Sequence, residues 1–252
     1  MGEIEDYLRT LQKRGPKTAL RELRSRFTRG DPKKTLNHLL DVLDGLGIKA
    51  TFFVVGYTAY YNQDMINKIL SYGHEIGCHG FFHNRIDLMN AEQLDYDVKL
   101  CVQLFKKYFS YSLKGYRAPY LKTSPFLPEV LERRGFNYSS SQMGQTAFSY
   151  QNDIMEYPVR YDDYDLLIKK RIGVSHMFSH LKDNLHSGEV LVLHPFRMGQ
   201  KENIGEYKMF LKDLGKRYEF KPLQDYNLDS VCITGDIGEL SNKELLMRMM
   251  GR

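Results

Sequence analysis

From Thr35 onward, apolar residues alternate between two spacings. Leu36, Leu39, Leu40 and Leu43 recur at helical spacing, and the short apolar run 49–56 that follows ends at a glycine, as buried strands often do. The pattern predicts further helices over 64–72, 91–109, 128–134, 175–185 and 207–218, and further strands over 74–78, 113–116, 137–141, 154–157, 189–193 and 220–223. Strands that alternate with helices predict βαβ units and a parallel sheet.

About seven such units favour an α/β barrel of about seven strands over an open sheet. No run rich in Pro, Ser or Gly divides the 252 residues, so we expect a single domain over 1–252. In barrels of this kind, functional side chains gather at the carboxyl ends of the strands. The residues that follow each predicted strand are therefore the first candidates for a site.

The composition limits the compartments in which the protein is expected. Three cysteines, odd in number and widely spaced, argue against a disulfide framework and fit a reducing compartment. The first 31 residues are charged throughout and lack the apolar core of a secretory signal, and no run approaches the roughly 20 apolar residues of a membrane span. We therefore expect a cytoplasmic protein with no signal peptide.

The net charge of +5 lies at the start of the chain, because residues 1–34 hold ten Lys/Arg and five Asp/Glu while the remainder balances. Leucines and Phe27 alternate with these charges, which predicts a basic helical segment. The segment is either a solvated helix face or a peripheral contact with an anionic membrane. Nucleic acid is not expected, since no nucleic-acid motif accompanies the basic residues.

Three polar motifs follow predicted strands. His79 and His83 stand four residues apart after the strand 74–78, Arg117-Ala118-Pro119-Tyr120 follows the strand 113–116, and His194 follows the strand 189–193. Because the carboxyl ends of parallel strands meet at one edge, we expect these side chains to lie close together. Paired imidazoles suit a divalent metal, and a further imidazole suits proton transfer.

Other residues have competing interpretations. His176 and His180 show the same spacing as His79 and His83, but they lie inside a predicted helix, which indicates a solvated helix face. His74 begins a strand, and we expect it to have a structural role. Tyrosines 57, 60 and 61 either stack on sugar rings or are partly buried amphipathic side chains.

These motifs resemble those of the polysaccharide deacetylase family, the NodB-homology domains of carbohydrate esterase family 4. The resemblance runs from about Thr35 to Leu223 and includes the run Ala50-Thr51-Phe52-Phe53 as well as the three polar motifs. It implies a distorted (β/α) barrel and a metal-dependent hydrolase that removes acetyl groups from N-acetylated sugars. The implied partner is a carbohydrate, either an N-acetylated glycan or a sugar conjugate.

The resemblance also implies roles for residues. His79 and His83 would bind a divalent metal, most often zinc, and the backbone N–H of Tyr120 would stabilise the developing oxyanion. Arg117 would orient a catalytic carboxylate, and His194 would protonate the departing amine.

The sequence departs from the family at its first motif, which normally supplies two aspartates, a catalytic base and a third metal ligand. Before the first helix the chain offers only Asp31, among basic residues, and the family's Trp-bearing motif is absent because the chain has no Trp. Three explanations stay open. The aspartate-bearing strand lies upstream of a helical insertion at 1–34; the carboxylates come from Asp31 or from Asp162, Asp163 and Asp165; or the protein is a degenerate glycan-binding barrel. A further alternative is a C–N hydrolase that acts on a small cyclic amide.

Overall fold

The computed structural model describes residues 32–150 and 152–238. Nearly all of the basic segment 1–34 lies outside these residues, as does Asp31, so its predicted helix and membrane contact stay predictions. No helix of the described residues is long and apolar enough to cross a bilayer.

The described strands form one sheet in the order β5-β6-β4-β3-β2-β1-β10-β8-β7, with β9 beside β10. Only the β5–β6 pair is antiparallel among these pairings. The strands are β1 (Thr51–Val54), β2 (Glu75–Cys78), β3 (Gly115–Tyr116), β4 (Tyr138–Ser139), β5 (Phe148–Ser149), β6 (Met155–Glu156), β7 (Val159–Asp162), β8 (Val190–Val192), β9 (Glu219–Phe220) and β10 (Ser230–Ile237).

The sheet curves into a barrel that is bridged at one point. Val159 of β7 pairs with Met143, beyond the end of β4, and its backbone N–H donates to the carbonyl of Gln142 at 2.7 Å. The expected distorted α/β barrel is confirmed. Its strands outnumber the expected seven because β5, β7 and β10 were not predicted.

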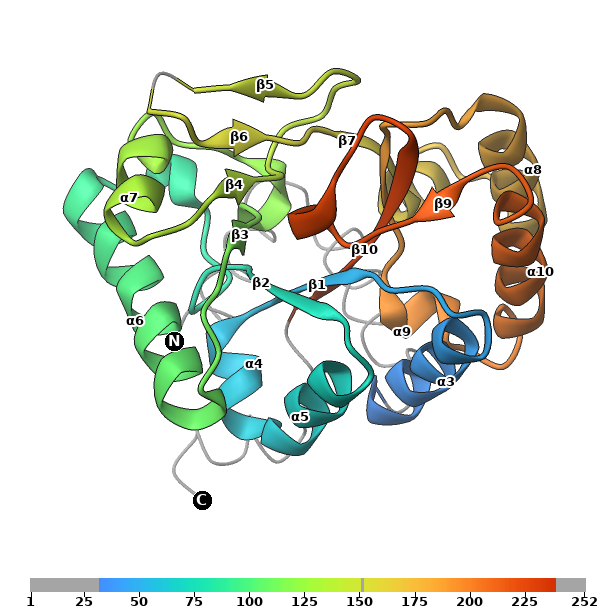
Figure 1. Cartoon of the computed structure of the whole chain (residues 1–252), viewed down its shortest axis with the longest axis horizontal. Helices are drawn as coiled ribbons and strands as arrows, with labels where there is room; N and C mark the ends of the chain where they lie inside the picture. The colour runs from blue at the N-terminus through green and yellow to red at the C-terminus, as the bar shows by residue number, and fades with distance from the viewer. Residues whose placement is uncertain (1–31, 151, 239–252) are drawn as a thin grey trace, which may run out of the picture.

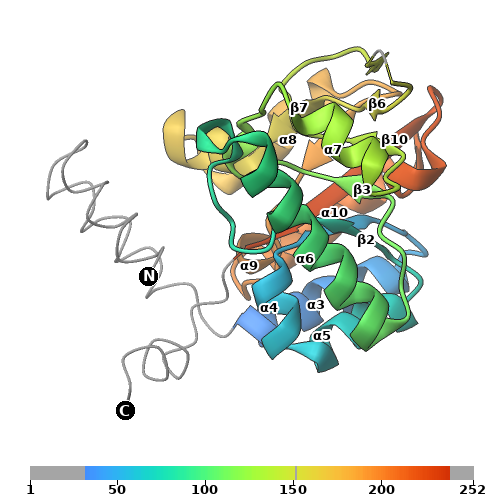
Figure 2. The same ribbon diagram turned by 90° about the vertical axis from the view of Figure 1, so that its left-hand side faces the viewer.

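Helices pack around the outside of the sheet (Figures 1 and 2). They are α3 (Pro32–Gly45), α4 (Gly56–Tyr61), α5 (Gln63–Ser71), α6 (Ala91–Phe109), α7 (Leu127–Arg133), α8 (Val174–Asn184), α9 (Pro195–Met198) and α10 (Ile204–Leu214), with short turns η1 (Ile86–Leu88), η2 (Pro119–Leu121), η3 (Asp165–Lys169) and η4 (Leu223–Asp225). Their apolar faces cover the sheet; the leucines of α3, for example, are buried.

The last strand differs from the prediction. A final strand was expected over 220–223, but β9 stops at Phe220 and the chain continues into the eight-residue strand β10. This strand lies between β1 and β8, with Thr234 opposite Thr51 and Cys232 opposite Val190 (Figure 1). A strand that is paired on both sides and buried on both faces favours apolar β-branched residues such as Val231 and Ile233. Its carboxyl end therefore lies among the strand ends that carry the predicted site.

Candidate active site

Four strand ends bring polar side chains to one edge of the barrel. His79 follows β2, Arg117 follows β3, His194 follows β8, and Asp236 lies near the end of β10. His79 and His194 each interact electrostatically with Asp236, so the four groups share one site. The structure thus brings together the imidazoles and the guanidinium that the sequence predicted, and it adds a carboxylate that the sequence analysis missed.

His79 presents one ring nitrogen to this site. Its Nδ1–H donates to the carbonyl oxygen of Arg117 at 2.9 Å, which leaves Nε2 facing Asp236 Oδ2 at 4.0 Å. Burial lowers the pKa of His79, although Asp236 and the Arg117 carbonyl oppose that shift. A neutral imidazole fixed by a carbonyl is the form that binds a metal.

His83 is held by a tight loop. Gly80 and His83 both have positive φ, 72° and 56°, and the backbone N–H groups of Phe81 and Phe82 donate to the carboxylate of Asp97 on α6, at 2.8 and 3.4 Å. This loop brings the ring of His83 within 4.9 Å of the His79 ring, centroid to centroid. Asp97 is buried, which raises its pKa, and it is a positioning residue that the sequence motifs did not predict.

Arg117 is fully buried and its guanidinium makes four hydrogen bonds. Nε donates to the carbonyl of Ser140 at 2.8 Å and Nη2 to its hydroxyl at 2.6 Å, while Nη1 donates to Thr234 Oγ1 at 2.8 Å and Asp236 Oδ1 at 2.9 Å. The guanidinium also lies 4.2 Å from the centroid of the Phe53 ring. Arg117 therefore fixes the orientation of the Asp236 carboxylate.

Asp236 is a carboxylate that none of the three sequence explanations named. Burial tends to raise its pKa, but the interactions with Arg117 above all, and with the imidazoles of His79 and His194, outweigh burial and lower it, so Asp236 is ionised near neutral pH. Its local signal is an apolar run, 231–233, followed by Thr234, Gly235 and the aspartate, which is weaker than at the other strand ends, where the polar residue follows the apolar run directly. Asp236 lies beyond Leu223, where the last predicted strand ends, and was therefore not predicted.

His194 is paired with the acidic end of β7. Its Nδ1–H donates to Asp163 Oδ1 at 2.5 Å, Asp163 Oδ2 accepts from its backbone N–H, and Asp162 lies 3.7 Å from the same nitrogen. Burial lowers the pKa of His194, but the two carboxylates outweigh burial and raise it. A protonated imidazole beside a buried carboxylate suits an acid that donates a proton.

The aspartates after Pro158 lie beside His194 or Lys169, and not beside the His79–His83 pair as one explanation expected. Asp162 ends β7 instead of following a strand that stops at Pro158, and Asp165 pairs with Lys169 at 2.6 Å on η3. Asp163 also accepts from Arg197 Nη1 at 3.0 Å. Asp162 and Asp163 therefore lie beside His194, whereas Asp165 pairs with Lys169.

Two donor sets could hold a divalent cation. Within the described residues, Asp162, Asp163 and His194 have ligand atoms within 4.8 Å of one another. However, both oxygens of Asp163 already accept hydrogen bonds, and Arg197 supplies the positive charge there. The imidazoles of His79 and His83 with Asp236 fit a metal better, because His79 Nε2 faces a carboxylate and its Nδ1 is fixed.

Tyr120 lies in η2 with an unusual backbone. It has φ 62° and Leu121 has φ 52°, a left-handed conformation that is costly for side chains with a Cβ. The Tyr120 ring lies 4.8 Å from the His83 ring, centroid to centroid, so the residue borders the site. The oxyanion role of its backbone N–H stays a prediction.

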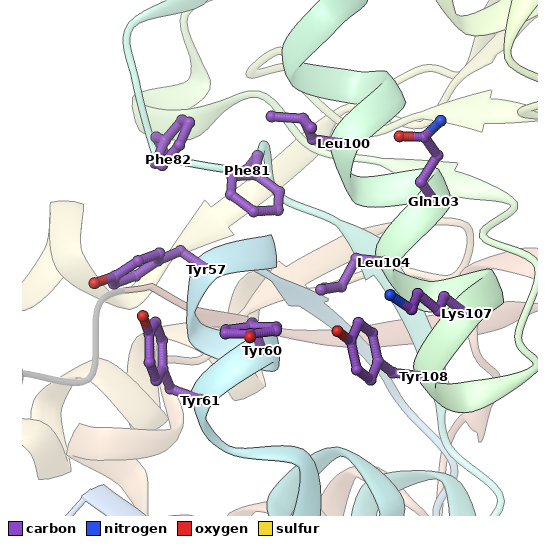
Figure 3. Close-up of a pocket in the computed structure, with 10 residues that line it drawn as sticks. All are labelled: Tyr57, Tyr60, Tyr61, Phe81, Phe82, Leu100, Gln103, Leu104, Lys107 and Tyr108. Carbon is purple, nitrogen blue, oxygen red and sulfur yellow. The ribbon is translucent and has the colours of Figure 1, made fainter.

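An aromatic groove of about 420 Å³ opens beside the His79–His83 loop (Figure 3). Tyrosines 57, 60 and 61 of α4 face Tyr108 and Lys107 of α6, and Phe81 and Phe82 come from the loop itself. Tyr60 packs edge-on against both Tyr61 and Tyr108. The predicted tyrosine cluster is therefore partly exposed and adjoins the site.

The remaining histidines lie elsewhere. His176 and His180 are exposed on α8, as their helical spacing predicted. His74 is buried at the start of the second strand, where Nδ1 accepts from the backbone N–H of Ala50 at 3.2 Å. Burial lowers the pKa of His74 to about 4, which agrees with a neutral, structural imidazole.

A distorted α/β barrel with imidazole, guanidinium and carboxylate groups at its strand ends has the architecture of the NodB-homology hydrolases. The family model described as polysaccharide deacetylase matches residues 26–139. The chain is similar to the polysaccharide deacetylase family over these residues, a little under half of its length.

Curated relatives agree with this assignment. The chain is 30% identical over 125 residues to the peptidoglycan deacetylase of Helicobacter pylori, which covers 50% of this chain and 40% of that protein. It is 24% identical over 193 residues to a peptidoglycan-N-acetylglucosamine deacetylase of Bacillus cereus, covering 75% of this chain and 80% of that protein. The chain spans less than half the length of the Helicobacter protein.

Solved structures share the fold. A proposed polysaccharide deacetylase from Mycobacterium smegmatis superposes with a TM-score of 0.64 at 23% identity, covering 81% of this chain and 75% of that one. A carbohydrate esterase family 4 pseudoenzyme from Bacillus anthracis superposes with a TM-score of 0.57 at 14% identity, covering 81% of this chain and 59% of that one. The fold alone therefore does not decide whether a member of this family is active.

Proposed function

We propose that this protein is a metal-dependent deacetylase that removes acetyl groups from N-acetylated sugar units of a glycan. The observation that carries the proposal is the Asp236 carboxylate, which Arg117 orients at 2.9 Å and which faces His79 Nε2 at 4.0 Å. A carboxylate, paired imidazoles and a separate protonated imidazole are the groups that amide hydrolysis needs at one place.

Each residue has a distinct task in the proposed reaction. His79 and His83 would hold the cation, and zinc suits imidazole donors. When bound, the cation would supply polarisation of the acetyl carbonyl and a lowered pKa for the attacking water. Asp236, kept ionised by Arg117, takes the proton from that water, and the backbone N–H of Tyr120 donates to the developing oxyanion.

His194 completes the reaction. The carboxylates of Asp163 and Asp162 raise its pKa, so the imidazole is protonated when the amine departs and can donate its Nε2 proton. The aromatic groove supplies a surface on which sugar rings stack, since Tyr57, Tyr60 and Phe82 present ring faces or edges beside the His79–His83 loop.

The test is acetate release from N-acetylglucosamine oligomers and from isolated peptidoglycan, with and without added zinc. We expect turnover that Asp236→Asn and His79→Ala abolish. His180→Ala is the matched control, because His176 and His180 form an exposed pair with the same spacing. Equal loss in the control, or equal release by Asp236→Asn, would contradict the proposal.

A second function, glycan binding without hydrolysis, rests on one specific observation. The resemblance implies two neighbouring aspartates at a strand end, whereas in the described part of the chain β10 carries Asp236 there, followed by Ile237 and Gly238. A protein of this kind would retain saturable binding of N-acetylglucosamine oligomers in calorimetry while releasing no acetate at any zinc concentration.

A further inference from the structure

Arg117 is held in place by the two serines that follow strand β4. Its guanidinium donates to the carbonyl oxygen of Ser140 at 2.8 Å and to the Ser140 hydroxyl at 2.6 Å. The next backbone N–H along the chain, that of Ala118, donates to the hydroxyl of Ser141 at 2.8 Å. Both serines are fully buried, so the position of their backbone determines where the Arg117 side chain lies.

Glu156, the last residue of β6, binds the backbone of the same segment from the neighbouring strand. Its Oε1 accepts from the backbone N–H of Ser141 at 2.6 Å and from that of Gln142 at 2.9 Å. Its Oε2 accepts from the hydroxyl of Tyr150 at 3.2 Å. Because β6 pairs with β4 (Figure 1), one side chain joins the end of β6 to the residues that follow β4.

One peptide group connects Glu156 with Arg117. The N–H of Ser141, which donates to Glu156, and the carbonyl of Ser140, which accepts from Arg117 Nε, belong to the same peptide bond. The atoms of a peptide bond lie in one plane, so the carboxylate on one side and the guanidinium on the other orient the same rigid unit. Hydrogen bonds linked in this way also polarise one another.

The burial of Glu156 indicates that this connection matters. The side chain is fully buried, and within residues 32–150 and 152–238 no Lys, Arg or His forms an ion pair with its carboxylate. A buried carboxylate is costly unless hydrogen bonds compensate its charge, and here two consecutive backbone N–H groups converge on one oxygen. An apolar side chain would fill the same space without that cost, but it would leave both N–H groups unpaired.

We propose that Glu156 is a positioning residue for the reaction, which holds the Arg117 guanidinium in the orientation that engages Asp236. It acts through the backbone of residues 140–142, because a fully buried side chain cannot touch a substrate. This inference rests on the proposed function, in which Asp236 is the base that Arg117 orients.

The test measures acetate release and, by NMR, the exchange of the Arg117 Nε–H with solvent. In Glu156→Ala we expect kcat to fall about 10–100-fold with little change in KM, because a displacement of about 1 Å costs up to about 100-fold in rate without removing a substrate contact. The Nε–H should exchange at least about tenfold faster, since its acceptor is no longer held. Glu156→Gln should restore both quantities towards the parent values, because an amide oxygen accepts from the same two N–H groups.

The matched control is Glu189→Ala. Glu189 is also a buried carboxylate that accepts from a backbone N–H, that of His186 at 2.9 Å, and it pairs with Arg160 at 3.1 Å. It directly precedes β8 and so lies at the amino ends of the strands, opposite the site. We expect the control to lose stability while its kcat and the exchange of the Arg117 Nε–H stay as in the parent.

Unchanged Nε–H exchange in Glu156→Ala would overturn the inference, as would equal effects of Glu156→Ala and Glu189→Ala. Equal impairment of Glu156→Gln and Glu156→Ala would also overturn it, because accepting hydrogen bonds would then not be the role of the side chain. If Glu156→Ala does not fold, Glu156→Met fills a similar volume without an acceptor and is judged by the same comparisons.

Exchange and turnover separate this inference from the proposed function. Faster Nε–H exchange in Glu156→Ala, in a protein whose parent releases no acetate, supports the hold of Glu156 on Arg117 and rejects the deacetylase. Acetate release with the same kcat in the parent and in Glu156→Ala supports the deacetylase and rejects the positioning role.

Discussion

Arg117 is the residue on which the electrostatics of the site depend. It is fully buried and pairs with Asp236, whose side chain is 13% exposed. We expect Arg117→Ala to lower the free energy of unfolding by about 3–5 kcal/mol, because the substitution leaves a largely buried carboxylate without its partner. Urea unfolding at pH 7 measures the change.

The control for that prediction is Arg133→Ala. Arg133 pairs with Glu129 on the surface of α7, with side chains 54% and 71% exposed, so its loss should cost less than about 1 kcal/mol. A cost for Arg117→Ala as small as that of the control would show that Asp236 is well solvated without its partner.

His194 should titrate above an ordinary histidine because Asp163 and Asp162 stabilise its charged form. A raised pKa contributes stability that is fully present below the unfolded value of about 6.5 and is lost as pH rises through the folded pKa. We expect Asp163→Asn to lower the pKa of His194, measured by NMR titration of the imidazole nitrogens. Asp165→Asn, which removes a carboxylate paired with Lys169 instead, should leave the titration unchanged.

The local sequence pattern was enough to predict some of the site residues and not others. His79, Arg117 and His194 were predictable because each directly follows an apolar run that forms a strand. Asp236 was not, since its significance depends on Arg117, a partner distant in sequence, and a single aspartate near a glycine is a common surface pattern. Asp97 was not predictable for a similar reason, because it lies inside a helix and accepts a hydrogen bond from the backbone of another segment.

Helix α6 positions the loop between His79 and His83, the proposed metal ligands, as well as covering the sheet. Its carboxylate Asp97 accepts from Phe81 N–H at 2.8 Å, so Asp97→Ala leaves that donor unsatisfied and releases the loop between His79 and His83. We expect zinc affinity to fall about 10–100-fold, the range typical of lost partners that orient metal ligands. Competition for Zn²⁺ with a chromogenic chelator measures it.

The matched control lies at the start of the same helix. Asn90 forms a capping box with Gln93, so Asn90→Ala should cost about 1 kcal/mol of stability while zinc affinity stays unchanged. If both variants weaken zinc binding equally, the effect of Asp97 is a general loss of helix stability.

The elements predicted most accurately from the sequence are those whose first and last residues are determined by neighbouring residues in the chain. Helix α6 begins and ends as predicted because the capping box and the apolar positions lie within it. The strands β3 and β4 are shorter than predicted, two residues each, because a strand ends where its partners diverge and not where its apolar run ends.

At the scale of the molecule, β10 joins the two sides of the barrel, between β1 and β8. We expect the full chain to unfold in one cooperative transition, as a single domain does. A chain that stops before Ser230 should show no such transition, because β1 and β8 lose their common partner and Val231 and Ile233 leave the core. Urea unfolding followed by near-UV circular dichroism checks this; two separated transitions in the full chain would contradict a single domain.

The class of the fold was predictable because alternation of strands and helices leaves few alternatives to a parallel sheet. The strand order was not. The residues 230–237 alone do not indicate that β10 pairs with β1, a strand from the first quarter of the chain. That pairing is decided by which buried strand edges remain open when the other strands have assembled.

The position of β10 also bears on how the protein is made. Synthesis produces His79, His83 and Arg117 well before Asp236, so an interrupted chain carries an unpaired buried cation and two open strand edges. Such a product is a ready target for cellular proteases and chaperones. Because the carboxylate proposed as the base lies on the last described strand, a chain interrupted before that strand would lack both a complete sheet and the proposed base.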